Sequence, residues 1–145
     1  MPYKRKKDVN KLIAKWKLKS KYPHYWHVFL WEDRESFEAN SRESKGALGV
    51  HNPCTFTVDG KGNYHFPPKM GEIHFIKDKW NLEIVVHELM HAFLFRISAL
   101  SDVNGLFNQV GDLDEKHCLE FGQWVENIYT ALWEVNPVKG WKKEK

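Results

Sequence analysis

The feature that most constrains this 145-residue chain is a long apolar segment, Trp80 to Leu100, with the pentapeptide HELMH at positions 87–91 inside it. Apolar residues occupy nearly every helical face of this segment, so we expect a central buried helix rather than a surface one. Histidines and a carboxylate inside such a helix are costly unless they have partners. The segment therefore predicts a helix built around a polar site.

The spacing of His87 and His91 indicates what that partner is. Residues four apart lie on one face of a helix, so both imidazoles can bind one metal ion from the same side. The helical period rotates Glu88 about 100° away from His87, where its carboxylate can take a proton from an attacking water and deliver it to a leaving amine. HExxH is the zinc-peptidase signature of this mechanism. We expect one Zn²⁺ per chain, although the same donors suit iron, manganese or cobalt.

A catalytic zinc normally has three protein ligands and one open position. The residues that follow the pentapeptide, AFLFRISAL, supply no third ligand. The start of the next expected helix, at about 113–133, supplies three candidates that spacing alone does not separate: Asp114, Glu115 and His117. Glu115 also has a structural interpretation, because Asp112 to Glu115 has the form of an N-terminal capping box.

Helical periodicity predicts which side of this second helix is buried. The inward face is expected to carry small and apolar side chains: Cys118, Phe121, Gly122, Val125 and Tyr129. Glu120 falls on nearly the opposite side, so we do not expect it at the metal.

Apolar patterning and turn residues predict the rest of the fold. We expect an amphipathic helix over residues 8–20, with Leu12, Ile13 and Trp16 in its apolar stripe. Strands are expected at 25–31, 46–50, 54–58, 64–66 and 72–77, with a hairpin turn at Asp59-Gly60. Strands followed by two long helices are typical of an α+β domain. We therefore expect a single domain over residues 1–145, with a small antiparallel or mixed sheet of roughly three to five strands packed on a zinc-binding helix and a second long C-terminal helix, as in zincins.

The strand expected at 72–77 directly precedes the zinc helix, and we expect it to lie at the edge of the sheet. An extended peptide can pair with such an edge, which makes Ile73, His74 and Phe75 candidate substrate-binding residues. An electrostatic donor usually stabilises the oxyanion in amide hydrolysis. The candidates for this role are His74, His117, Tyr129 and Tyr64.

Basic residues are concentrated in the N-terminal segment, at about residues 1–21, where nine lysines and arginines accompany one acid, Asp8. Such a segment can contact nucleic acid or a protein, and it can equally be a solvated end that keeps the chain soluble. No apolar run follows it, and no stretch approaches the roughly 20 apolar residues that cross a bilayer. We expect a protein of the bacterial or phage-infected cytoplasm without membrane contact, with Cys54 and Cys118 as reduced thiols.

The pentapeptide, followed after a loop by EKHCLEFG at 115–122, resembles the ImmA/IrrE-type metallopeptidases of bacteria and phages. That family pairs HExxH with a later helix of the form Glu-x-x-Ala-x-x-Phe-Ala. The resemblance implies that His87, His91 and Glu115 bind the zinc ion and that Glu88 is the general base. Other small zincins, such as the SprT-like group, use a third histidine, which keeps His117 as the alternative.

The sequence departs from the family pattern at Cys118 and Gly122, where alanine is usual. Both residues are small, so we expect close packing between the two helices to survive. This departure bears on which family the chain resembles more than on whether the chain has a metal site.

The expected function is zinc-dependent hydrolysis of a peptide bond in a protein substrate. The resemblance implies a regulatory protein as that substrate, in a phage or mobile-element setting. The alternative is a zinc-stabilised phage or mobile-element protein that acts as a binding module with little or no turnover, in which a fourth protein ligand closes the metal site. Glu88 favours the peptidase, because a purely structural site needs no carboxylate beside the metal.

Overall fold

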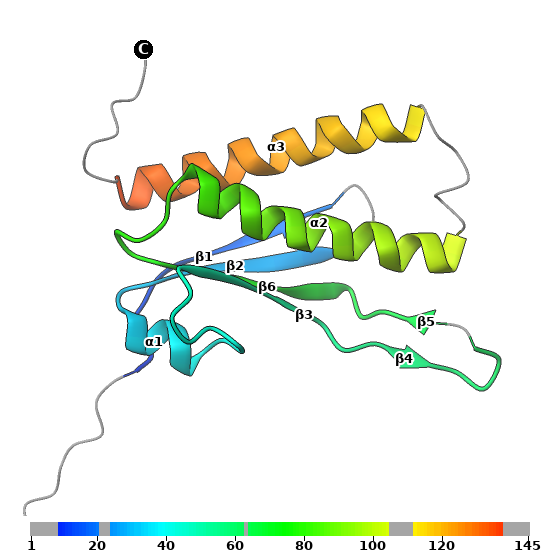
Figure 1. The fold of residues 1–145 in the computed structure, drawn as a ribbon, viewed down its shortest axis with the longest axis horizontal. Coiled ribbons are helices and arrows are strands. Elements are labelled where there is room, and N and C mark those ends of the chain that lie inside the picture. Colours follow the sequence, from blue (N-terminus) through cyan, green and yellow to red (C-terminus); the bar gives the residue numbers. More distant parts are fainter. Residues whose placement is uncertain (1–8, 21–23, 63, 105–111, 138–145) are drawn as a thin grey trace, which may run out of the picture.

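Two long helices cover one face of a four-stranded sheet, and a short helix covers part of the other face (Figure 1). The computed structural model describes residues 9–20, 24–62, 64–104 and 112–137, without the side chains of residues 64, 98–104 and 112–116. In chain order the elements are β1 (Leu12–Lys19), β2 (Tyr25–Trp31), α1 (Arg34–Ala39), β3 (Gly49–Pro53), β4 (Thr57–Val58), β5 (Tyr64–His65), β6 (Lys69–Ile76), α2 (Leu82–Asn104) and α3 (Asp112–Val135). The expected α+β class and the two long helices are confirmed.

The main sheet has the strand order β1-β2-β6-β3 and is mixed. β2 pairs antiparallel with β1 and parallel with β6, and β3 pairs antiparallel with β6. The expected hairpin is also present, because β4 and β5 pair antiparallel as a separate two-stranded sheet. The prediction that residues 72–77 form an edge strand is wrong. β6 lies between β2 and β3 and is buried on both faces, as central strands are.

The expected helix over residues 8–20 is a strand in its described part, β1. Lys15, Lys17 and Lys19 are exposed, whereas Trp16 and Leu18 between them are more buried. This alternation has the period of two that a half-buried strand requires. The conformation of this segment is therefore decided by pairing with β2. The helical spacing of its first apolar residues does not decide it.

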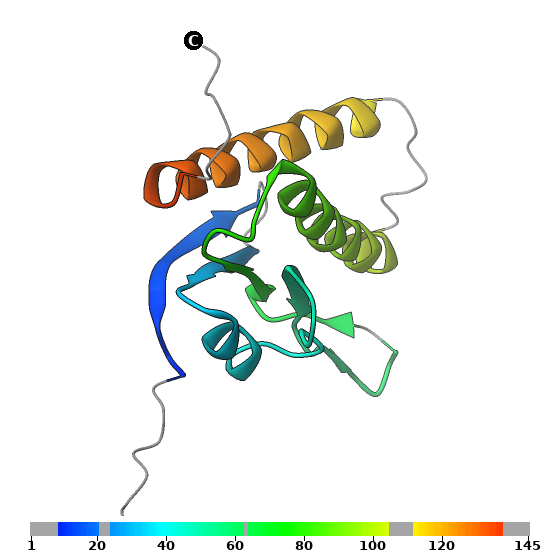
Figure 2. The same ribbon diagram turned by 60° about the vertical axis from the view of Figure 1, so that its left-hand side comes forward.

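The core lies between the sheet and the two long helices. Trp26 of β2 is fully buried, and its ring meets that of Trp124 of α3 edge-on at a centroid distance of 5.2 Å. α2 packs on the β6 and β3 side of the sheet and α3 packs near β1, as Figure 2 also shows. A smaller cluster on the other face joins Phe37 of α1 to Trp31 and Ile76.

α2 is not buried all round, contrary to expectation. Its inner side carries buried residues such as Val85, Leu89 and Phe93. Its outer side exposes residues that include Glu83, His87, Met90, His91 and Leu94. Within the described residues, no helix is both long and apolar enough to span a bilayer.

α3 buries a different stripe from the expected one. Trp124, Ile128 and Leu132 are buried, whereas Cys118 and Gly122 are exposed. The expected close approach of small residues between the helices is therefore wrong at these two positions, and larger rings fill the interface instead. The aromatic Phe121 and Tyr129 are half-buried, so the predicted inward face is rotated by a fraction of a turn rather than reversed.

Glu120 also departs from expectation, because it faces α2. Its carboxylate pairs with the guanidinium of Arg96, which is fully buried and lies over the rings of Phe93 and Trp124. A buried arginine requires such a carboxylate, since an uncompensated charge in the interior is strongly destabilising.

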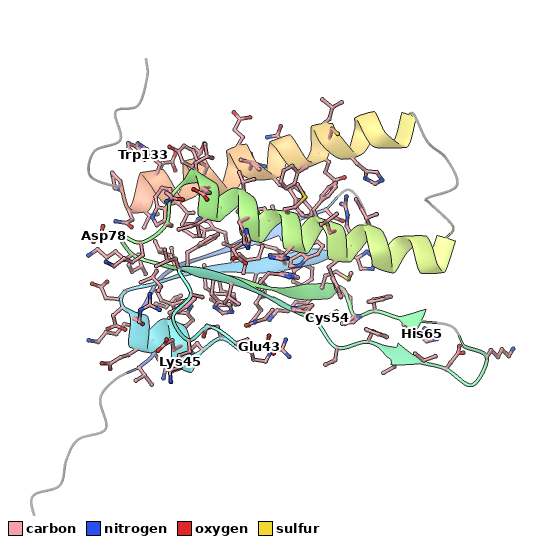
Figure 3. All side chains as sticks on the ribbon, in the orientation of Figure 1. Glu43, Lys45, Cys54, His65, Asp78 and Trp133 are labelled. Carbon is pink, nitrogen blue, oxygen red and sulfur yellow. The ribbon has the colours of Figure 1, made fainter. Side chains whose placement is uncertain are left out.

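A buried asparagine joins the C-terminal end of α3 to the turn between β6 and α2. The amide oxygen of Asn136 accepts hydrogen bonds from the Asp78 backbone N–H at 2.8 Å and from the Trp80 indole N–H at 2.9 Å. Its amide nitrogen donates to the Asp78 carboxylate at 2.8 Å. Figure 3 shows Asp78 near the same end of α3 as Trp133. These bonds fix where α2 begins relative to α3.

Candidate metal centre on helix α2

His87 and His91 lie one helical turn apart on the outer side of α2. Their Nε2 atoms are 3.1 Å apart, and their ring centroids are 4.7 Å apart. Both side chains are exposed, and in the absence of a metal the 3.1 Å distance corresponds to a hydrogen bond between the two rings. The structure therefore brings together the two imidazoles that the i, i+4 spacing predicted.

The donor geometry of this pair fits a zinc ion. Two nitrogen ligands at about 2.0–2.1 Å in a tetrahedral site are separated by roughly 3.3 Å. The separation between the two Nε2 atoms, 3.1 Å, is close to this value. One imidazole pair is an incomplete set, and at least one further ligand is required.

Glu88 lies beside the pair but is turned towards the sheet. Its Oε1 atom is 3.9 Å from Nε2 of His87, and its side chain is 9% exposed against 65% for His87. Burial raises the pKa of the Glu88 carboxyl, and His87, His91 and a hydrogen bond from the His51 backbone partly offset that increase. A carboxylate with a raised pKa is suited to accept and release a proton near neutral pH.

β3 lies at the edge of the sheet next to this part of α2, and Gly49 makes the close approach possible. A Cβ atom at Gly49 would lie 2.9 Å from Cγ2 of Ile84 and 3.1 Å from Cγ of Glu88. Between β3 and α2 there is a cavity of 340 Å³, lined by Ala47, Leu48, Gly49, Glu83, Ile84, His87 and Glu88. The histidine pair and the carboxylate therefore adjoin a cavity that ends at the edge strand.

His51 is a residue of this region that sequence analysis did not select. It lies in β3 on the side facing α2, and its Nε2 accepts a hydrogen bond from the Trp26 indole N–H at 3.2 Å. Burial, with a contribution from the charge of His91, lowers the pKa of His51 to about 4. His51 is therefore neutral near pH 7. Nothing in its local sequence signals this position, which depends on how β3 packs on α2.

The three candidate third ligands lie at the start of α3. Asp114 and Glu115 are on its first turns, but their side chains are outside the described part of the structure. His117 is described, and its ring packs edge-on against Phe93 at 5.7 Å, away from the outer side of α2. Among the described side chains, no group of three histidines, cysteines or carboxylates is arranged to hold a metal.

The structure does not place the other selected residues at the histidine pair. Ile73 and Phe75 are fully buried in the core, so they cannot pair with a substrate as edge residues. His74 is buried on the opposite face of the sheet, where its ring stacks on Phe29 at 4.7 Å. Tyr129 packs against Trp80 at the far end of α3, and the side chain of Tyr64 is outside the described residues.

Comparison of this chain with protein-family models, with curated proteins and with solved structures finds no match.

Proposed function

We propose that this protein is a zinc-dependent peptidase whose metal is held by His87 and His91, with Glu88 as the general base. The observation that carries the proposal is the 3.1 Å separation between the two exposed Nε2 atoms, beside a buried carboxylate. The third ligand is proposed at Glu115, with Asp114 and His117 as the alternatives that the experiment below separates. A zinc ion bound here would polarise the scissile carbonyl and lower the pKa of a water molecule towards about 7.

The residues of the chain supply the proton transfer. Glu88 takes a proton from the attacking water as the new C–O bond forms, and it delivers that proton to the amine nitrogen as the C–N bond breaks. Its burial supports this role, because a raised pKa allows the carboxyl to hold the proton between the two steps. The products are a carboxylate and an amine, so no further co-reactant is needed.

The substrate is proposed to bind at β3 rather than β6. An extended peptide can pair with an edge strand by β-augmentation, and β3 is a terminal strand of the main sheet. The 340 Å³ cavity between β3 and α2 gives a side chain of such a peptide a place beside Glu88. The scissile bond would then lie between the edge strand and the histidine pair.

Metal content and turnover of the full chain without a histidine tag test the proposal. One equivalent of zinc is expected in the wild type and in Glu88→Gln. Loss of zinc is expected in His87→Gln and His91→Gln, and no loss in His65→Gln, which alters an exposed histidine of β5. Cleavage of a proteome-derived peptide library is expected for the wild type and is expected to be absent for Glu88→Gln.

Separate Asp114→Ala, Glu115→Ala and His117→Ala variants identify the third ligand, since only the ligand variant should lose zinc. X-ray absorption of the zinc-loaded protein then counts its protein ligands. Three ligands and an open position support the peptidase, whereas four would identify a closed structural site. A wild-type protein that binds no metal after zinc is added back would show that the proposal is wrong.

A further inference from the structure

The face of the sheet opposite α2 and α3 carries lysines paired with aromatic rings. Across the antiparallel pair β1–β2, three lysines each lie opposite a ring: Lys15 opposite Phe29, Lys17 opposite His27 and Lys19 opposite Tyr25. On the other side of β2, Lys69 of β6 is the register partner of Tyr25. We call these residues the lysine–aromatic face: Lys15, Lys17, Lys19, Tyr25, His27, Phe29 and Lys69.

The rings of this face form a row along β2. The centroids of Tyr25 and His27 are 5.2 Å apart, and those of His27 and Phe29 are 6.1 Å apart. All three side chains are half-buried, and the Phe29 ring also stacks on His74 at 4.7 Å, so Tyr25 and His27 are the rings that a base would reach. α1 covers the end of the sheet at which Trp31 lies, where Phe37 packs on it, and leaves the Tyr25 end to the lysines.

The charges of this face are positive and lie over the rings. The Lys17 ammonium is 4.0 Å from the centroid of Tyr25, and that of Lys15 is 5.3 Å from the centroid of Phe29. Glu72 pairs with Lys69 at 2.5 Å, so these two charges offset each other, and Glu72 also contacts the His74 ring at 3.2 Å. The net positive charge of the face therefore comes from Lys15, Lys17 and Lys19. Burial, and then the charges of Lys15, Lys69 and Lys17, lower the pKa of His27, whereas Glu72 acts in the opposite direction.

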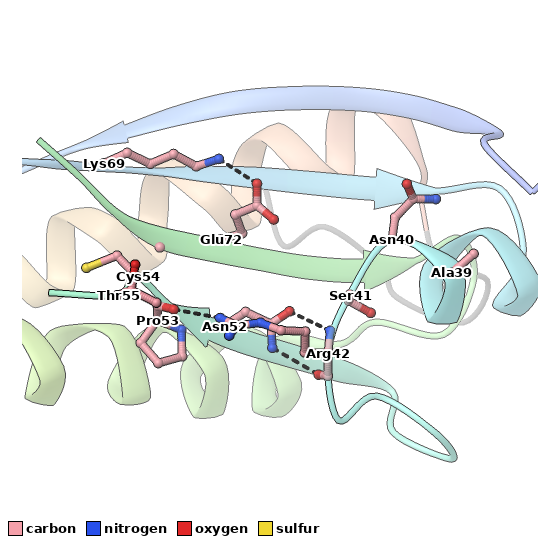
Figure 4. A pocket seen from close by; sticks show the side chains of 11 residues that line it. Ala39, Asn40, Ser41, Arg42, Asn52, Pro53, Cys54, Thr55, Lys69 and Glu72 are labelled. Carbon is pink, nitrogen blue, oxygen red and sulfur yellow. Dashed lines mark hydrogen bonds and ion pairs between the residues drawn. The ribbon is translucent and has the colours of Figure 1, made fainter. Parts of the chain in front are cut away.

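A cavity of 670 Å³ continues this face beyond Lys69, towards β3 (Figure 4). Lys69 and Arg42 bring two cations to its lining, and Glu72 is drawn there with its bond to Lys69. The wall is held in place by Asn52, whose amide accepts from the Arg42 backbone N–H at 2.8 Å and donates to the Arg42 carbonyl at 2.9 Å. The cavity is within the size range of small-molecule sites.

We propose that the lysine–aromatic face binds single-stranded nucleic acid, with bases stacked on its rings and phosphates held by its lysines. Rings in a row beside cations are the combination that single strands require, because every base has a π-face and every nucleotide a negative charge. A duplex keeps its bases stacked inside and would leave the rings unused. An acidic peptide would use the lysines but gain nothing from the row of rings.

This inference is independent of the proposed peptidase. The lysine–aromatic face and the histidine pair lie on opposite sides of the sheet, since His51 of β3 points to α2 and the rings of β2 named above point away. The basic N-terminal segment of the sequence continues into β1, where Lys15, Lys17 and Lys19 become part of this face. A single strand bound here would leave the edge of β3 free for a peptide.

Fluorescence anisotropy with a labelled oligothymidylate of about 15 nucleotides tests the lysines of the full chain. The triple variant Lys15→Gln/Lys17→Gln/Lys19→Gln is expected to lose at least about tenfold in affinity and to reduce the slope of log K against log salt by about 2. The matched control, Lys45→Gln/Lys61→Gln/Lys79→Gln, removes the same charge from exposed positions elsewhere and is expected to change affinity less than about twofold. Equal losses in the two triple variants would show that binding reflects only the general charge of the chain and would overturn the proposal.

A second variant and two competitors test the rings. Tyr25→Leu/His27→Leu keeps every lysine and is expected to lose at least about fivefold in affinity, with folding checked by circular dichroism. A duplex of equal length is expected to bind the wild type at least about tenfold more weakly, and polyglutamate is expected to displace the oligonucleotide poorly. Tight duplex binding, efficient displacement by polyglutamate, or a ring variant that binds like the wild type would each overturn the proposal. Glu88→Gln is expected to bind the oligonucleotide with wild-type affinity. The outcome of this binding test is therefore separate from the outcome of the peptidase test.

Discussion

The side chains of Glu88 and His87 are neighbours in the sequence but lie in opposite environments, because Glu88 is 9% exposed and His87 is 65% exposed. Oε1 of Glu88 is nevertheless only 3.9 Å from Nε2 of His87. One turn of α2 therefore presents two imidazole nitrogens to solvent and keeps a carboxylate with a raised pKa buried next to β3. The proposed peptidase would require this division, since a substrate must reach the metal and the general base must hold a proton between the two steps.

Gly49 is expected to control the distance between β3 and Glu88. Gly49→Ala places a Cβ 2.9 Å from Cγ2 of Ile84, and this overpacking should lower the free energy of unfolding by about 1–3 kcal/mol. Ile84→Ala removes the obstructing methyl group, so the cost of Gly49→Ala should be smaller in the double variant. Urea denaturation of the four proteins measures the coupling. Gly60→Ala is the control, because a Cβ there meets no atom within 4 Å. Strict additivity would contradict the prediction.

His51 is expected to make stability depend on pH between about 4 and 6.5. Its folded pKa is lowered to about 4 from 6.5, so the unfolded chain binds more protons in this window. The free energy of unfolding should therefore fall as pH decreases from 6.5 to 4, by up to about 3 kcal/mol from this residue. His51→Gln keeps an acceptor for the Trp26 indole and should flatten the dependence. Thermal or urea unfolding with a chelator present measures it.

His65→Gln is the matched control for His51, since this histidine is 60% exposed on the β4–β5 hairpin. The pH dependence of stability should be weaker in His51→Gln than in this control. If His51→Gln kept the same slope as His65→Gln, His51 would not be the residue that titrates on unfolding.

The ion pair between Arg96 and Glu120 is expected to be sensitive to the loss of either partner, because Arg96 is fully buried. Glu120→Gln removes the carboxylate that the fully buried Arg96 contacts in α3, and it should lower the free energy of unfolding by about 3–5 kcal/mol. Replacing both residues, as Arg96→Met/Glu120→Met, should recover most of the loss, because a buried pair contributes little net stability. Chemical denaturation measures both variants. Glu126→Gln, on an exposed part of α3, should change stability by less than about 0.5 kcal/mol.

Asn136 is expected to stabilise the junction of α2 and α3 mainly by accepting hydrogen bonds from buried N–H groups. Asn136→Ala leaves the Trp80 indole N–H and the Asp78 backbone N–H without their acceptor and should cost about 1–3 kcal/mol. Asn136→Asp keeps the acceptor but places a second carboxylate beside Asp78, so it should not restore full stability at neutral pH. A wild-type melting temperature for Asn136→Ala would show that water replaces these bonds.

Sequence periodicity predicted the two long helices and the strand β2, because each has a long run of consistent pattern. It failed at β1, where Leu12, Ile13 and Trp16 fit a helical stripe while the lysines from 15 to 19 alternate as in a strand. Local pattern could not resolve this conflict, since pairing with β2 resolves it. The position of β6 in the sheet was missed for a related reason. Strand order depends on the crossover from β2 to β6, which no local signal specifies.

In the candidate site too, some residues follow from local sequence and others depend on long-range packing. The convergence of His87 and His91, with Glu88 beside them, follows from spacing within one helix, so the sequence predicts it. His51 and Gly49 enter the region only because β3 packs on α2, and their local sequence has no feature that signals it. Glu120 was assigned to the wrong side of α3 because the buried stripe is centred on Trp124 rather than on the small residues.

The strand order β1-β2-β6-β3 also has a consequence for synthesis of the chain. β1 and β2 can pair as soon as both have left the ribosome, but the other edge of β2 is completed only when residues 69–76 arrive. Until then a strand rich in aromatic residues has an open hydrogen-bonding edge, which invites pairing with other chains. Non-local parallel pairing of this kind also slows folding. The nascent chain is therefore most prone to aggregate between the emergence of β2 and that of β6, and a chaperone would be most useful in that interval.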